Sequence, residues 1–109
     1  MAGNDLERYV VSTREPLLRQ LNHWAAEATA LGLRTEYIGV LKHFNTLLET
    51  RPHSWGDMLR ELHTIDVVFR RGMIAKWLLV WYGVHDEAKT VVVHDLAPAP
   101  GSPLSPRAV

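Results

Sequence analysis

The sequence predicts an α+β fold with a short N-terminal strand, an αα-hairpin and then a three-stranded antiparallel meander. Apolar residues recur at helical spacing through most of the stretch from Ser12 to Leu62. The last third alternates strand-forming runs with turn residues. A chain of 109 residues that is 47% apolar is long enough for a single domain around one core.

The N-terminal half is expected to hold one strand and two helices. Residues 9–11 are aromatic or β-branched, which favours a short strand. The first helix is expected to end at Gly32, and its buried stripe is Leu17, Leu21, Trp24, Ala28 and Leu31. The second helix is expected to end before Pro52, and its stripe is Tyr37, Val40, Leu41, Phe44, Leu47 and Leu48.

The C-terminal half is expected to hold the meander. Residues 53–57 read as a loop, and Met58 to Leu62 as one further helical turn. The three strands are expected at 65–71, 76–84 and 90–96, with a tight turn at 72–75 and a polar loop at 85–89. The central strand is apolar on both faces, which is typical of a strand with cover on both sides.

The composition changes at Pro98. Four prolines fall in the last twelve residues, and no apolar period is present there. Residues 1–97 are therefore expected to form a single domain, and residues 98–109 a disordered Pro/Ser-rich tail.

The bulk composition excludes several kinds of chemistry. The chain has no cysteine, which removes disulfides, thiolate chemistry and cysteine zinc sites. No histidine pair has the i, i+4 spacing of a helical zinc motif, so neither a metal nor another cofactor is expected. No signal peptide and no membrane-length apolar run is evident, so a cytoplasmic protein that does not enter the membrane is expected. The formal net charge is zero, so the overall basic excess that is usual for a nucleic-acid-binding protein is absent. A nucleic acid could then be bound only by a local basic patch.

Three segments resemble the RelE/ParE-type toxin superfamily. They are Leu59–Leu62 (LREL), Phe69–Gly72 (FRRG) and Trp81–Val93 (WYGVHDEAKTVVV). With the order of elements, the resemblance covers roughly Tyr9 to Leu96. It implies the toxin of a bacterial type II toxin–antitoxin pair, bound by a cognate antitoxin. It also implies an mRNA target on the ribosome for a RelE-type endoribonuclease, or DNA gyrase for a ParE-type inhibitor.

The candidate site residues follow from this hypothesis and from their chemistry. Basic side chains could hold phosphate groups and stabilise charge on a scissile phosphate, and a tyrosine could stack on a base. Histidine could move protons near neutral pH. The RNA-binding candidates are Arg60, Arg70, Arg71, Lys76 and Tyr82, and the catalytic candidates are His94 and Arg70.

Each candidate also has a purely structural interpretation. Basic residues at strand ends discourage edge-to-edge aggregation, and Tyr82 could be a sheet residue with its hydroxyl at the rim. The family often has an arginine four residues before the strand tyrosine, where this chain has Leu78. The alternative function is therefore a non-catalytic binding protein on the same fold. Trp77 and Trp81 are expected to pack against the helices, and Trp55 either anchors a partner or folds back over the core.

Overall fold

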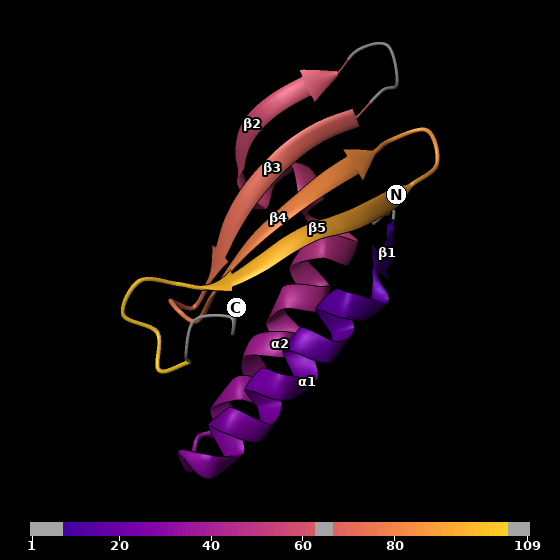
Figure 1. The fold of residues 1–109 in the computed structure, drawn as a ribbon. Coiled ribbons are helices and arrows are strands. Elements are labelled where there is room, and N and C mark those ends of the chain that lie inside the picture. Colours follow the sequence, from indigo (N-terminus) through magenta and orange to yellow (C-terminus); the bar gives the residue numbers. More distant parts are fainter. Residues whose placement is uncertain (1–7, 63–66, 105–109) are drawn as a thin grey trace, which may run out of the picture.

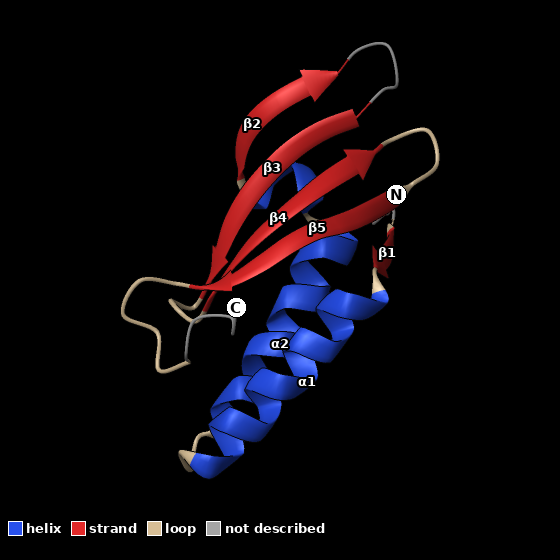
Figure 2. Ribbon diagram, in the orientation of Figure 1, coloured by secondary structure: helices blue, strands red, loops and turns tan. Residues whose placement is uncertain are grey.

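The computed structural model describes residues 8–62 and 67–104. A pair of long helices packs against one side of a twisted sheet (Figures 1 and 2). In chain order the elements are β1 (Val10–Thr13), α1 (Glu15–Ala30), α2 (Arg34–Thr50), α3 (Pro52–Trp55), β2 (Asp57–Leu62), β3 (Val67–Ile74), β4 (Leu78–His85) and β5 (Thr90–Pro98).

The sheet has five strands in the order β1-β5-β4-β3-β2. The strands from β2 to β5 pair antiparallel with their neighbours, whereas β1 pairs parallel with β5. The predicted α+β class is confirmed, with the N-terminal strand, the αα-hairpin and the meander in the predicted order. The sheet gains a further strand, β2, at one edge.

The helices bury most of the residues that their apolar spacing predicts, but the predicted Leu31 is exposed beyond the end of α1. On α1 the buried residues are Leu17, Leu21, Trp24 and Ala28, and on α2 they are Tyr37, Val40, Phe44 and Leu48. The Tyr37 hydroxyl donates a hydrogen bond to the Leu21 carbonyl at 2.9 Å and so ties the helices together. Gly32, which follows the C-cap residue Leu31 of α1, takes a positive φ of 75° and so allows the sharp reversal into α2. Neither these helices nor the short α3 is long and apolar enough to cross a bilayer.

Strand β4 defines the two faces of the sheet. Leu78, Val80, Tyr82 and Val84 are fully buried in the core beneath the helices. The intervening Leu79, Trp81 and His85 are only half-buried, because side chains alternate between the faces of a strand. We call the face that carries Trp81, away from the helices, the open face.

Three local predictions between Pro52 and Lys76 are wrong. Residues 53–55, which belong to the predicted loop at 53–57, form most of the short helix α3 instead. Residues 57–62 form β2 rather than a helical turn, because pairing with β3 satisfies their backbone. The β3–β4 turn is centred on Ala75 and Lys76, not on 72–75, since Gly72 and Met73 stay paired with β4. The expected start of the first meander strand at Ile65 lies outside the described residues.

The segment after residue 97 contributes to the packing as far as Leu104. Pro98 pairs with Leu78, and the Ala99 amide donates to the Trp77 carbonyl at 2.9 Å. Ala99 and Leu104 are each only 4% exposed. Residues 98–104 therefore depart from the expected disordered tail, because their few apolar side chains cover core that the sheet leaves open. Residues 105–109 lie outside the described part of the chain.

Candidate functional site

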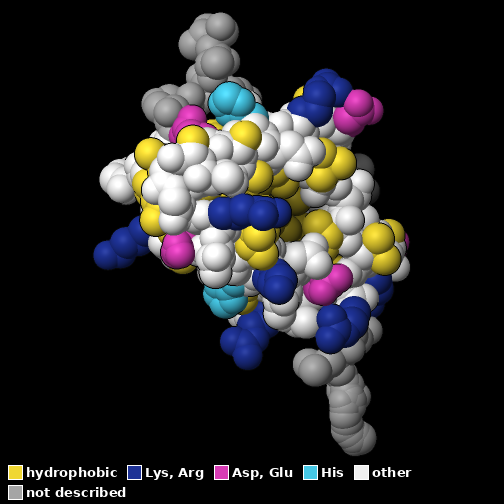
Figure 3. Space-filling model, turned by 90° about the horizontal axis from the view of Figure 1, so that it is seen from below, with side chains coloured by type: hydrophobic (Ala, Val, Ile, Leu, Met, Phe, Trp, Pro, Cys, Tyr) yellow, Lys and Arg dark blue, Asp and Glu magenta, His cyan; other side chains and the backbone are white. Residues whose placement is uncertain are grey.

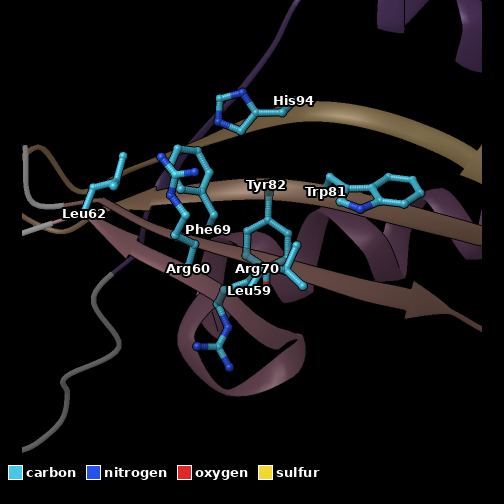
Figure 4. Close-up of a pocket in the computed structure, with 8 residues that line it drawn as sticks. All are labelled: Leu59, Arg60, Leu62, Phe69, Arg70, Trp81, Tyr82 and His94. Atoms are coloured by element: carbon cyan, nitrogen blue, oxygen red, sulfur yellow. The ribbon is translucent and has the colours of Figure 1, made fainter.

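A groove of about 420 Å³ crosses the strands at the β2 side of the sheet (Figure 4). Its lining is mostly apolar and aromatic and comes from four neighbouring strands, β2 to β5. The lining residues are Leu59, Arg60, Leu62, Phe69, Arg70, Trp81, Tyr82 and His94. We refer to this feature as the groove.

Two irregularities in strand pairing border the groove. The register between β2 and β3 shifts between Met58 and Arg60, so that Leu59 is the extra residue. The register between β4 and β5 shifts between Trp81 and Tyr82, so that His94 has no partner opposite it. A β-bulge redirects the side chain of its extra residue, and bulges are over-represented next to active sites. Both extra residues line the groove.

The imidazole of His94 lies over the backbone of β4 at Gly83. A Cβ atom at Gly83 would approach His94 Nε2 to 2.9 Å, so the absence of a side chain at Gly83 leaves room for the ring where it lies. The Phe69 ring lies beside it, with centroids 5.3 Å apart and planes tilted by 47°. Phe69 and Gly83 are themselves cross-strand partners. The side chain of His94 is therefore positioned by two neighbouring strands.

The surroundings of His94 favour its neutral form. Partial burial lowers the pKa of His94 below 6.5, and the nearby charges of His85 and Arg14 lower it further. A neutral imidazole at neutral pH can accept a proton, which is the requirement for a general base. Arg14 and His85 thus belong to the electrostatic environment of the site, and sequence reasoning missed this role for both.

Of the predicted basic residues, Arg60 is the one with an exposed side chain at the groove. It is paired with Phe69 across β2 and β3, so both side chains point to the same side of the sheet. Arg70 lines the groove but turns its guanidinium toward Gly56. Its Nε donates to the Gly56 carbonyl at 3.1 Å, and its Nη2 donates to the same oxygen. Arg70 therefore fixes the segment that leads into β2.

The side chain of Tyr82 points to the helix side, opposite to His94 (Figure 4). Its hydroxyl donates to the Pro52 carbonyl at 2.8 Å and accepts from the Gly56 amide at 3.2 Å. Burial raises the pKa of this phenol, against smaller opposing effects of the Gly56 amide and Arg70. The Trp55 ring stacks on it at 5.4 Å with an interplanar angle of 11°. These contacts favour the structural interpretation of Tyr82 and the folded-back position of Trp55.

Arg71 and Lys76 lie apart from the groove. Arg71 is exposed and contributes to a separate cavity of about 450 Å³ that is also lined by Asp57, Met73 and Leu79. Lys76 occupies the β3–β4 turn, at the opposite end of β3 from Phe69. The structure thus brings Arg60, Arg70, Tyr82 and His94 to one place and leaves the other two predicted residues outside it.

The aromatic lining was not anticipated. Trp81 was expected to pack against the helices, but it lies on the open face and lines the groove, because Tyr82 takes the buried position. The sequence analysis did not predict a role in the site for Phe69. Its tie to His94 depends on a cross-strand register that no local pattern shows.

The surface carries charged side chains of both signs, in keeping with a net charge of zero (Figure 3). Seen from below, the surface has a hollow that shows hydrophobic side chains, with several Lys and Arg side chains around it and a few Asp and Glu side chains among them (Figure 3).

Comparisons with known proteins found no matching family model, no matching curated protein and no matching solved structure.

Proposed function

We propose that the chain is the toxin component of a bacterial type II toxin–antitoxin system and that it acts as an mRNA endoribonuclease. The observation that carries the proposal is the position of His94. It is the extra residue of a bulge, it lies over Gly83 and beside Phe69, and its pKa is lowered. The resemblance of the strand motifs to RelE/ParE-type toxins supports the same class.

The groove has the composition of a single-stranded RNA site. Phe69 and Trp81 come from neighbouring strands and offer aromatic surfaces on which unpaired bases can stack. Arg60 is exposed at the β2 wall and can bind a phosphate oxygen. The charged, solvent-exposed part of the groove is therefore small. Stacking of bases on the aromatic rings supplies much of the affinity for RNA.

The proposed reaction is cleavage by the RNA's own 2′-hydroxyl. His94 takes the 2′-hydroxyl proton while the 2′ oxygen forms a bond to phosphorus. The bond from phosphorus to the 5′ oxygen breaks, and that oxygen takes a proton from water. The products are a 2′,3′-cyclic phosphate and a free 5′-hydroxyl. Arg60 stabilises the charge that builds up on the phosphate oxygens.

The test is cleavage of a single-stranded RNA by the purified chain, with and without bacterial ribosomes. His94→Gln removes the base, and the rate is expected to fall by about 10²- to 10⁴-fold. Arg60→Gln is expected to weaken binding. Arg71→Gln is the matched control, because it removes the same charge outside the groove. If His94→Gln cleaves at the wild-type rate, the assignment is wrong.

A second function has its own support, namely a non-catalytic inhibitor that uses the groove to bind a protein. The groove is mostly apolar, and Arg70, a predicted catalytic residue, has its guanidinium bonded to Gly56. Under this hypothesis an apolar segment of the target, such as DNA gyrase, would fill the groove. Growth arrest that survives His94→Gln but is lost in Trp81→Ala would favour this inhibitor over the nuclease.

A further inference from the structure

A second cluster of polar side chains lies on the helix side, at the ends of three segments remote in sequence. One carboxylate oxygen, Asp86 Oδ1, accepts a hydrogen bond from the Tyr9 hydroxyl at 2.7 Å and pairs with His53 Nε2 at 2.7 Å. The rings of Tyr9 and His53 meet edge to face at 6.2 Å. The Lys89 ammonium lies 5.3 Å from the centre of the Tyr9 ring. We call Tyr9, His53 and Asp86 the clasp.

The clasp contacts α3 through His53. A second set of contacts, through Trp55 and Pro52, attaches α3 to the sheet. Trp55 stacks on Tyr82 and covers Gly72, where a Cβ atom would come within 2.5 Å of the indole. The carbonyl of Pro52 accepts the Tyr82 hydroxyl. The four residues of α3 are therefore held by side-chain contacts at both ends, not by their own single helical turn.

Strand β2 starts two residues after Trp55, through Gly56, whose carbonyl and amide are bound by Arg70 and Tyr82. Residues 57–61 are exposed, and among the described strands β2 lies at the edge of the sheet, beside β3. Leu59, Arg60 and Leu62 of β2 form one wall of the groove. The position of α3 therefore sets where this wall begins.

We propose that the clasp is a conformational control element: the contact of His53 and Tyr9 with Asp86 holds α3 in place and thereby keeps the β2 wall of the groove closed against β3. Opening the clasp releases α3, and β2 then separates from β3 more often. Edge strands with few buried contacts are the parts of a fold that open at low free-energy cost. The inference concerns the geometry of the groove and holds whether the groove takes RNA or protein.

The charges around Asp86 agree with this role. Hydrogen bonds from His53 and then Tyr9 lower the pKa of Asp86, against a smaller effect of burial, and the charges of His53 and Lys89 add to the lowering. Of the other charged groups nearby, Glu49 at the end of α2 is bonded to Arg8 at 3.3 Å. The side chains of His53 and Asp86 are 41% and 44% exposed, so solvent screens the pair and its effect is local.

The test is amide hydrogen exchange of the full chain, which requires no ligand. In His53→Ala, the β2 amides are expected to exchange about three- to tenfold faster, while those of α1 and α2 keep their wild-type rates. His53→Gln restores a donor at a similar distance and is expected to recover much of the protection. Tyr9→Phe removes the second donor and is expected to have an intermediate effect.

A matched control is available on α1. Glu15→Gln disrupts the Glu15–Arg19 pair, which is as close, at 2.6 Å, and also exposed. It is expected to leave β2 exchange unchanged. Unchanged β2 exchange in His53→Ala would overturn the proposal. So would a uniform increase over all elements, which would indicate global destabilisation. Neither result depends on RNA cleavage, so failure of the clasp and failure of the nuclease hypothesis are separable.

Discussion

His94 and Gly83 form a fitted pair across β4 and β5, in which the absence of a side chain at one position makes room for the ring at the other. A Cβ atom at Gly83 would lie 2.9 Å from Nε2 of His94. Gly83→Ala is therefore expected to push the imidazole outward and to destabilise the protein by about 1 kcal/mol, since a surface ring can move aside. Chemical denaturation measures the cost. Nuclear magnetic resonance would show the His94 pKa rising toward its ordinary value, and an unchanged pKa would contradict the fit.

The lowered pKa of His94 makes stability depend on pH in a defined direction. The unfolded chain binds a proton at this position near pH 6.5, and the folded protein binds it only at lower pH. The contribution of His94 is therefore fully present above pH 6.5 and is lost as pH falls through the folded-state pKa. In urea denaturation between about pH 5 and 7.5, His94→Gln should lose less stability on acidification than wild type. Parallel curves would count against the assignment.

Gly72 and Gly39 should respond in opposite directions to the same substitution. A Cβ at Gly72 would collide with the Trp55 indole at 2.5 Å, so Gly72→Ala is expected to cost about 1–3 kcal/mol and to shift tryptophan emission to longer wavelength. Gly39 in α2 has nothing within 4 Å of such an atom, so Gly39→Ala is expected to stabilise by about 0.5–1 kcal/mol. Thermal denaturation distinguishes them. Equal effects would show that Trp55 does not pack on β3.

The β3–β4 turn uses residues that are poorly suited to its backbone. Ala75 and Lys76 have φ values of 47° and 61°, and the Trp77 amide closes the turn on the Ile74 carbonyl at 2.7 Å. Positive φ at both central positions is the type I′ pattern, which prefers Asn-Gly. The double change Ala75→Asn, Lys76→Gly is expected to raise the unfolding free energy by about 1 kcal/mol. Lys76→Ala, which removes the charge alone, should give no gain.

The fold class can be predicted from the sequence because the apolar patterns of the helices are local in sequence and extend over many residues. The α1 and α2 stripes extend over several turns, and their buried residues are largely those that the spacing indicates. Strand β2 was missed because residues 57–61 are exposed, so no alternation of burial marks them. The turn was misplaced because Gly72 looks like a turn residue, whereas its missing side chain makes room for Trp55.

The site was predictable only in part, because it depends on register. Arg60 and His94 were proposed from residue chemistry, and the structure places both at the groove. Arg70 and Tyr82 line the same groove but use their polar atoms to hold Gly56 and Pro52. Trp81 could not be assigned, since the apolar run of β4 does not show which face meets the helices. Phe69 could not be assigned because its contact with His94 depends on its pairing with Gly83 in the neighbouring strand. Bulges place Leu59 and His94 at the groove, and no single-strand pattern reveals a bulge.

The parallel pairing of β1 with β5 joins the first and the last of the described strands in one sheet. On a translating ribosome, Val10 to Thr13 have no strand to bind until Thr90 to Val93 have been made. His94 follows directly after that partner segment. The sheet therefore cannot be complete, nor the candidate base in place, until β5 has been synthesised. A chain that lacks β5 would have neither the complete groove nor the full sheet that covers the helices, and quality-control proteases would recognise its exposed apolar core.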